Sequence, residues 1–312
     1  MIKYLKHSEI NKPKWDECIR NSPNGMIYAY SWYLDTVCPG WEALVEDDYD
    51  SLMPLPVGKK YGYIYTYPPP FVQQLGVFSI HGIKEEKVKD FITAIPAQYR
   101  YVEMNLNEKN AIHSSVVEVN EHVSYTLDLS RPYSEIFSLY SSQTKRNLKK
   151  AMASSLTIVQ SAQSEKIIKL FSENRGMELE LPVAFYTVLR QLIKKMSSKG
   201  LVKCIGVNDK NNAMCAGAFF VKDAGRDIFL FSGANKNAYD SHAITFLINS
   251  YIEEYSGTPS IFDFEGSMDI DLARFYAGFG STKINFPVIR KNNLPAPVKW
   301  IKEMQYKRKT SS

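Results

Sequence analysis

Two carboxylates, Asp263 and Glu265, stand two residues apart at the end of a short apolar segment and directly before a Gly-Ser pair. Side chains two apart on a β-strand lie on the same face, so we expect both carboxylates on one face and the flanking phenylalanines on the other. A carboxylate at a strand end can take a proton from a nucleophile, which makes Glu265 the candidate general base. A structural interpretation also stands: the two acids form ion pairs with Lys or Arg on a half-exposed strand.

A basic run provides a second group of candidate residues, Lys145, Arg146, Lys149 and Lys150. Residues 145 and 149 are four apart, as are 146 and 150, so on a helix the four cations form two adjacent stripes. Such a surface can bind the phosphates of a carrier molecule. The alternative is a solvated helix face, which is the usual role of a charge run.

Composition and charge limit what the 312-residue chain can be. It is 45% hydrophobic and 23% charged, with 20 Tyr and 16 Phe, which excludes a disordered or low-complexity protein and predicts about two domains. The net charge of +5 divides unevenly: residues 1–130 carry 12 Lys/Arg against 17 Asp/Glu, and residues 131–312 carry 26 against 16. We therefore predict domains at 1–130 and 131–312, with an anionic partner for the second.

Several protein classes are not expected. The sequence contains no apolar run long enough for a signal peptide or a membrane span, so a cytoplasmic protein without a transmembrane segment is predicted. The four cysteines lack CxxC spacing and the five histidines are scattered, so no metal site is expected. Residues 300–309 are basic; they could contact an anionic membrane or nucleic acid, or could serve only for solubility.

The predicted elements describe a mixed α/β protein. Strands and helices alternate in the first half, where residues 61–67 read as a strand with Tyr61, Tyr63, Tyr65 and Tyr67 on one face. That face could line a groove, with Gln73 in its lip, although packing between domains is the commoner role for such a ladder. In the second half, a pair of helices precedes three antiparallel strands, and a helix, a strand, a helix and a final strand follow. The expected ranges of these seven elements are 201–207, 213–221, 228–232, 243–255, 260–264, 270–278 and 283–289.

This order of elements, together with local motifs, resembles the FemAB-like branch of the acyl-CoA N-acyltransferase (GNAT-related) superfamily. The basic segment 143–151 resembles that family's basic helix. Segments 263–268 and 272–280 resemble its aromatic strand, Gly-Ser pair and following helix. The resemblance implies two tandem acyltransferase folds, with residues 1–130 a degenerate copy and 131–312 the copy that carries the motifs.

The resemblance also implies roles for individual residues. An acyl-CoA or another activated acyl carrier would be the cosubstrate. Its expected contacts are Lys145, Arg146, Lys149, Lys150, Asn235 and Lys236. Tyr276 stands where the family has Lys and could donate its hydroxyl there, beside Glu265 as base; packing is the alternative role of Tyr276. The acceptor would meet Tyr63, Tyr65, Gln73, Asp263 and Arg274.

Two departures from the family pattern bear on the donor. No charged heptad insertion is present for the coiled-coil arm that contacts tRNA in some members, so a tRNA partner is not expected. Residues 235–242 contain no glycine, so the usual phosphate-binding loop is missing.

The leading hypothesis is an N-acyltransferase that moves an acyl or aminoacyl group onto an amine of a cell-envelope, polysaccharide or lipid precursor. The alternative is a non-catalytic binding or regulatory protein on a decayed acyltransferase fold.

Overall fold

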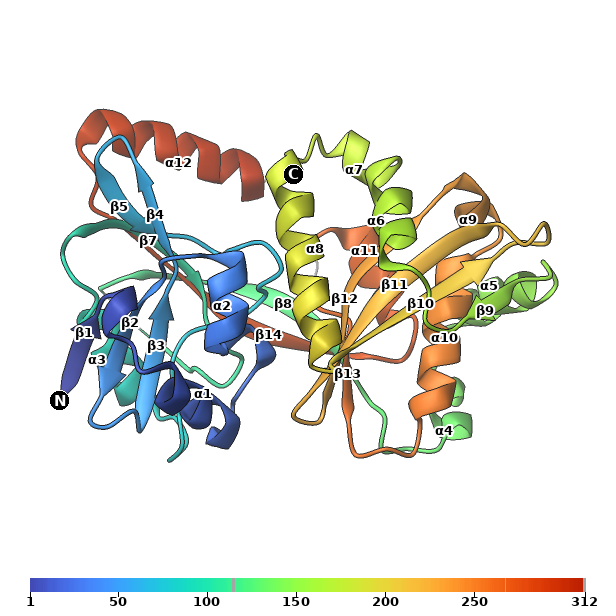
Figure 1. The fold of residues 1–312 in the computed structure, drawn as a ribbon, viewed down its shortest axis with the longest axis horizontal. Coiled ribbons are helices and arrows are strands. Elements are labelled where there is room, and N and C mark those ends of the chain that lie inside the picture. Colours follow the sequence, from blue (N-terminus) through green and yellow to red (C-terminus); the bar gives the residue numbers. More distant parts are fainter. Residues whose placement is uncertain (114–115, 267, 311–312) are drawn as a thin grey trace. The chain divides into compact units, whose positions relative to one another are not determined.

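The computed structural model describes residues 1–113, 116–266 and 268–310, and the chain forms two compact units (Figure 1). Unit 1 consists of Met1–His122 together with Phe286–Ser312, and unit 2 of Val123–Asn285. This division differs from the predicted boundary at residue 130, chiefly because the C-terminal segment belongs to unit 1. The physical reason is strand pairing: β14 (Thr282–Asn292) pairs antiparallel with β7 (Tyr99–Asn105), a strand of unit 1.

The regrouping changes the meaning of the charge asymmetry. Residues 286–312 carry seven Lys/Arg and one Glu, and these basic residues now count with unit 1. Unit 1 then holds 19 Lys/Arg against 17 Asp/Glu, and unit 2 holds 19 against 16. Neither unit is strongly charged, and the positive charge is concentrated in the C-terminal segment.

Unit 1 is built on an antiparallel sheet in the order β1-β2-β3-β6 and on a second group of strands, β4-β5-β7-β14. Trp15 and Trp41 are completely buried here with ring centroids 4.7 Å apart, and the Trp15 indole donates to the Ala29 carbonyl oxygen at 2.8 Å. The remaining strands are β1 (Ile2–Leu5), β2 (Glu42–Glu46), β3 (Ser51–Leu55), β4 (Val57–Lys60), β5 (Tyr63–Thr66) and β6 (Phe78–Ser79). The helices are α1 (Lys12–Asn21), α2 (Ser31–Val37), α3 (Glu85–Thr93) and α12 (Ala296–Thr310), with 3-10 turns at His7–Glu9 and Ile27–Ala29.

The predicted tyrosine strand is a hairpin instead. Strands β4 and β5 pair antiparallel from Val57↔Thr66 to Lys60↔Tyr63, and Tyr61 lies in the turn with φ +52° and 82% exposure. A turn with two positive-φ residues reverses the chain, so the prediction that all four tyrosines share one strand face is wrong. Only Tyr63 and Tyr65 lie within β5, and both are half-buried.

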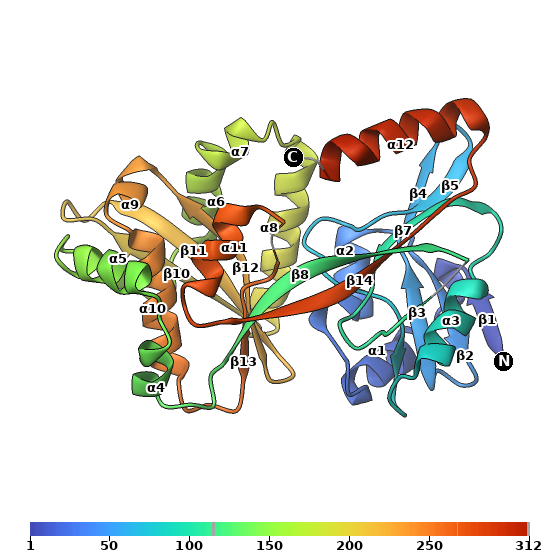
Figure 2. The ribbon, with the colours of Figure 1, turned by 180° about the vertical axis from the view of Figure 1, so that it is seen from behind.

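Unit 2 contains the strand order β8-β13-β12-β11-β10-β9 (Figure 2). The antiparallel meander predicted for its three central strands is confirmed, since β10 pairs with β11 and β11 with β12. Its strands are β8 (Glu118–Asp128), β9 (Thr157–Val159), β10 (Val202–Asn208), β11 (Met214–Asp223), β12 (Arg226–Ala234) and β13 (Ile261–Asp263). Its helices are α4 (Tyr133–Ser138), α5 (Ser142–Met152), α6 (Ser164–Ser172), α7 (Arg175–Glu178), α8 (Val183–Ser198), α9 (Lys236–Asp240), α10 (Ala243–Tyr255) and α11 (Ile270–Ala277).

Helices cover both faces of the central strands of unit 2. On one face, α10 packs on β10 and β11 and lies beside α5 (Figure 2). On the other, α6 lies so close to the sheet that a Cβ on Gly233 would stand 2.4 Å from the Ile167 carbonyl oxygen. Glycine at this strand position is therefore required by the close approach of a helix backbone.

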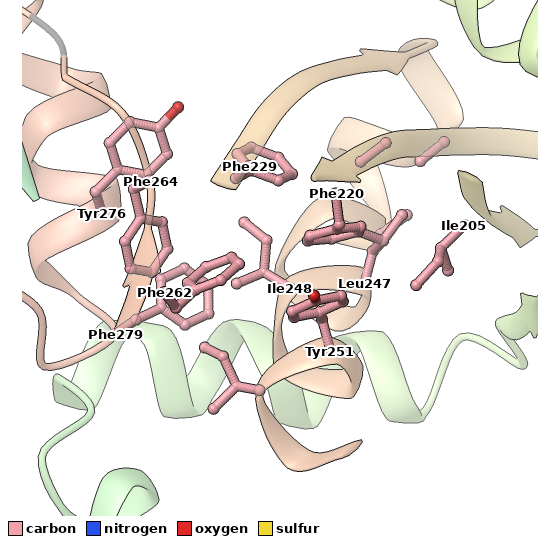
Figure 3. Packing of buried hydrophobic residues seen from close by; sticks show 14 of the residues in the cluster. Ile205, Phe220, Phe229, Leu247, Ile248, Tyr251, Phe262, Phe264, Tyr276 and Phe279 are labelled. Carbon is pink, nitrogen blue, oxygen red and sulfur yellow. The ribbon is translucent and has the colours of Figure 1, made fainter. Parts of the chain in front are cut away.

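The core between α10 and the sheet is largely aromatic (Figure 3). Phe220 and Tyr251 stack with ring centroids 4.0 Å apart and an interplanar angle of 7°, and Phe262 lies 5.4 Å from Tyr251. Stacked and tilted aromatic pairs add specific geometry to the large apolar area that they bury. This core holds β12, β13 and α11 in place around the candidate site described next.

Each unit contains a pair of parallel strands with a helix between them in the chain. In unit 1, β5 pairs parallel with β7 and α3 lies between them in the chain. In unit 2, β12 pairs parallel with β13 and α10 lies between them. The α/β class with mixed sheets is thus as predicted, and a duplicated fold would show this repetition.

Candidate functional site

The parallel strands β12 and β13 part soon after they meet. Their register covers three residue pairs only, Arg226↔Ile261, Asp227↔Phe262 and Ile228↔Asp263. Strand β12 continues for six more residues, to Ala234, paired with β11 on its other side. Among the described residues, this stretch therefore has no strand neighbour on the β13 side, and we call the place where the two strands part the opening.

Tyr276 of α11 stands at this opening. Its ring packs against Phe264, Phe229 and Tyr125, with centroids 5.1, 6.5 and 6.4 Å away, and the residue is 7% exposed. The hydroxyl makes no hydrogen bond to any described residue, and Figure 3 shows it pointing away from the aromatic cluster. Burial raises the pKa of Tyr276, and the negative charges of Glu265 and Asp263 raise it further. The phenol thus stays protonated and can donate a hydrogen bond.

Asp263 is buried and satisfied within the fold. It is 0% exposed, and its carboxylate accepts from Arg226 Nη1 at 2.5 Å, Ser124 Oγ at 3.0 Å and the Glu265 backbone N–H at 2.8 Å. Burial raises the pKa of Asp263, and the Arg226 guanidinium opposes that rise. These contacts favour a structural role for the Asp263 carboxylate, as an ion pair with arginine. The pair is buried, whereas the sequence predicted a half-exposed strand.

Glu265 does not continue the strand face of Asp263. Strand β13 ends at Asp263, and Glu265 has the left-handed value φ +58°, which is uncommon for a residue with a Cβ. Its backbone is held at both ends, because its N–H donates to Asp263 and its carbonyl accepts from Tyr125 N at 3.4 Å. The side chain is half-buried, and its charge acts on Tyr276. The expectation that the two carboxylates share one strand face is therefore wrong, because the chain turns between them. The next motif residue, Ser267, lies outside the described residues.

The basic run forms α5, as predicted, with Ser141 as its N-cap accepting from Thr144 N at 3.1 Å. Lys145 donates to the Ser138 carbonyl oxygen at 2.9 Å, and its ammonium lies 5.4 Å from the centre of the Phe137 ring. The structure thus gives Lys145 a local partner.

The other three cations of α5 are exposed. Arg146 donates to Gln143 Oε1 at 2.7 Å, whereas Lys149 and Lys150 lie in the last turn. Burial lowers the pKa of His242, and the charge of Lys150 lowers it further. Lys150 therefore acts electrostatically at the start of α10, where His242 lies.

The segment without glycines between β12 and α10 is itself helical. Asn235 caps α9, accepting from Ala238 N at 3.1 Å, and the Lys236 side chain is exposed. His242 is the N-cap of α10 with φ +57°, and its side chain makes no capping hydrogen bond. The Asn235 side chain therefore caps α9. The N-terminus of α10 is the positive end of the dipole of a 13-residue helix.

The residues proposed for the acceptor are spread over both units. Tyr63, Tyr65 and Gln73 belong to unit 1; Gln73 accepts from Asn105 Nδ2 through its backbone carbonyl at 2.9 Å. Arg274 of α11 is exposed in unit 2 and pairs with Asp271 at 3.5 Å. Unit 2 therefore brings together Tyr276, Glu265 and Asp263 within one neighbourhood, and Arg274 lies on the same helix as Tyr276.

Sequence reasoning missed two residues of this neighbourhood, Arg226 and Tyr125. Arg226 neutralises Asp263 from 37 positions away, and the Tyr125 ring packs against that of Tyr276. Only the Arg226 contact could have been predicted in kind from the sequence, because an acidic side chain in a buried strand requires a cation beside it. Within the described residues, no group of three or more His, Cys, Asp or Glu side chains could hold a metal ion. None of the described helices is both long and apolar enough to cross a membrane.

Comparison with solved structures places this geometry among known folds. The chain is similar to FemX, with a TM-score of 0.62 and 10% identity over 91% of this chain and 96% of that one. It is also similar to the C-terminal domain of a candidate lysylphosphatidylglycerol synthetase from Agrobacterium fabrum, with a TM-score of 0.56 and 9% identity over 93% of each chain. A conserved protein of unknown function from Bacteroides thetaiotaomicron gives a TM-score of 0.55 and 10% identity, over 93% of this chain and 99% of that one.

No family model and no curated protein matches the sequence. At these identities the similarity establishes the fold alone. The chain shares the fold of FemX, and this is the fold that the resemblance of its second half predicted.

Proposed function

We propose that the protein is an N-acyltransferase whose reaction takes place where β12 and β13 part. The observation that carries the proposal is this opening, where β12 and β13 part, with the protonated, nearly buried Tyr276 hydroxyl at its edge. Protein groups that donate to a developing oxyanion in a partly dry site stabilise an acyl-transfer transition state. Similarity of fold to FemX and to the domain from the lysylphosphatidylglycerol synthetase supports the same class by analogy.

In this proposal an amine attacks the acyl carbonyl of an activated ester or thioester. A C–N bond forms, the C–O or C–S bond to the carrier breaks, and the departing oxygen or sulfur takes up a proton. Glu265 accepts the proton of the attacking amine, and the Tyr276 hydroxyl donates to the carbonyl oxygen as charge develops on it. Because the pKa of Tyr276 is raised, this side chain is a donor throughout and never the base.

The carrier is an acyl-CoA or another anionic acyl carrier. Lys149, Lys150 and the N-terminus of α10 are the groups that would meet its phosphates, with Arg146 exposed in the middle of α5 and Lys236 exposed at the start of α9. The acceptor is an amine of a cell-envelope, polysaccharide or lipid precursor, and Arg274 is the exposed cation that would meet it. Contact of Tyr63, Tyr65 and Gln73, which belong to unit 1, with the acceptor stays a prediction.

A non-catalytic binding protein on the same fold is the second candidate. Two observations favour it: Tyr276 replaces the family lysine, and α9 replaces a glycine-rich phosphate loop. A decayed site would retain the opening but would not need an ionised Glu265 or the Tyr276 hydroxyl.

The test is a transfer assay with purified protein, a panel of acyl-CoA thioesters and aminoacyl-tRNAs, and diamine or aminosugar acceptors, read by mass spectrometry. Tyr276→Phe should lower the rate about 10²–10³-fold, the usual effect of losing one oxyanion donor. Glu265→Gln should also lower it, most strongly below the pKa of the acceptor amine, where a base is needed.

Tyr239→Phe is the matched control, because that tyrosine is 61% exposed on α9. Unchanged rates in the Tyr276 and Glu265 variants would refute the assigned roles. If no donor reacts or raises the melting temperature, the binding protein becomes the better conclusion.

A further inference from the structure

Helix α12 attaches to unit 1 through its polar side. Glu303 accepts from Arg290 Nη1 and from Asn292 Nδ2, each at 2.6 Å. The Arg290 guanidinium lies 4.2 Å from the centre of the Tyr306 ring, and Lys302 Nζ lies 4.7 Å from that of Tyr101. The side chains of Lys302, Glu303 and Tyr306 therefore face the protein.

Three large apolar side chains of α12 are exposed to solvent instead. Trp300 is 65% exposed, Ile301 51% and Met304 38%. At about 100° per residue, these three positions fall within an arc of roughly 100° on the helix. A helix at the surface of a globular protein normally buries its apolar stripe, whereas α12 leaves these three apolar side chains exposed. An exposed apolar stripe of this kind marks an interaction surface.

The charge of the segment indicates what that surface meets. Five basic residues and one acidic residue lie between 296 and 310, and the segment 286–312 supplies most of the positive charge that distinguishes the C-terminal half. A basic helix with tryptophan on its apolar side matches an anionic lipid surface in both charge and polarity. A second copy of the helix would set like charges against each other. RNA would use the cations and the indole but would leave Ile301 and Met304 without a partner.

We propose that α12 lies on the surface of an anionic lipid membrane, with Trp300, Ile301 and Met304 in the interface, attracted there by the positive charge of its segment. The 15-residue helix is about 22 Å long, short of the roughly 30 Å hydrocarbon core, so it lies along the membrane. This surface is independent of the proposed acyl transfer, since none of the residues named for that reaction belongs to α12.

The experiment is cosedimentation of the full chain with vesicles of phosphatidylcholine containing 30% phosphatidylglycerol, beside vesicles of phosphatidylcholine alone. Binding should occur to the anionic vesicles and weaken as salt rises. Replacing Trp300, Ile301 and Met304 together by serine should lower the partition coefficient at least about tenfold, since binding scales with the apolar area inserted. The matched control replaces Met177 and Val183 by serine; these are 69% and 80% exposed on unit 2 and should leave binding unchanged.

Tryptophan emission provides a second readout that misfolding would not mimic. Trp15 and Trp41 are fully buried and Trp32 is half-buried, so Trp300 is the indole most open to solvent. Its emission should shift to shorter wavelength on addition of anionic vesicles and become protected from acrylamide.

Three results would overturn the proposal: no binding to anionic vesicles at low salt, binding that the triple variant retains without a change in emission, or binding of the parent to RNA but not to vesicles. The first result excludes an anionic membrane as the partner. The second excludes the apolar side chains of α12 as the contact, and the third identifies nucleic acid as the partner.

Discussion

The ion pair between Arg226 and Asp263 allows a quantitative test of how unit 2 is stabilised. The Asp263 side chain is 0% exposed and the Arg226 side chain 17%, so the pair is almost fully removed from water. Removing one partner of such a pair leaves an uncompensated buried charge, which costs about 3–5 kcal/mol. We expect Arg226→Met to lower the free energy of unfolding of unit 2 by about that amount at pH 8.

Part of this cost should be recovered in two ways. Burial raises the pKa of Asp263 and Arg226 opposes that rise, so without the arginine the carboxyl takes up a proton more readily and the variant should lose less stability at pH 5. The double variant Arg226→Met, Asp263→Leu carries no buried charge, and apolar replacement of both partners is often neutral. Its destabilisation should therefore be smaller than that of either single variant.

The assay is urea unfolding of the four proteins of this double-mutant cycle, followed by circular dichroism at pH 5 and pH 8. A coupling energy below about 1 kcal/mol, or single-variant effects that simply add, would refute the reasoning. In that case Arg226 does not stabilise the buried Asp263 carboxylate, and its other donors, Ser124 and the Glu265 N–H, would be enough to hold it.

Three further predictions concern stability. Burial raises the pKa of Asp223 to about 6, so the contribution of this carboxyl to stability is present below about pH 4 and is lost as the pH rises through 6. Asp223→Asn should therefore raise the free energy of unfolding in urea by at most about 3 kcal/mol at pH 8, and by less at pH 5. The control variant Asp240→Asn, at an exposed position, should leave the free energy of unfolding unchanged at both pH values. Gly233→Ala should destabilise by about 1–3 kcal/mol or more, because the new Cβ meets the backbone of α6; an unchanged melting temperature would contradict this packing. The Tyr140 hydroxyl is buried with no hydrogen-bond partner among the described residues, so Tyr140→Phe should leave the free energy of unfolding unchanged or raise it. Tyr251→Phe removes a 2.9 Å hydrogen bond to the buried Asp227 carboxylate and should lower the free energy of unfolding by about 1–3 kcal/mol in the same assay.

Local patterns were enough to predict most elements of unit 2. The three strands predicted at 201–207, 213–221 and 228–232 correspond to β10, β11 and β12, and the helix predicted at 243–255 corresponds to α10. These signals depend on neighbours within a few positions, so they can be read without the fold. The acyltransferase resemblance rested on the same elements in sequence order.

Other features depended on contacts between distant residues. The tyrosine run was taken for one strand because period-two spacing does not reveal a turn at Tyr61, whose φ is positive. Glu265 was placed on the face of Asp263 for the same reason, although the backbone turns after β13. In both cases alternation was extended past the residue at which the chain changes direction.

From the sequence alone came the residue types that can do chemistry, their order and the class of fold, because these follow from side-chain identity and short-range spacing. Tertiary structure decided which of them act together. It paired Asp263 with Arg226, positioned Tyr276 at the opening between β12 and β13, and assigned the basic C-terminal segment to unit 1. Burial and long-range pairing make these choices, and neither is encoded at any single position of the chain.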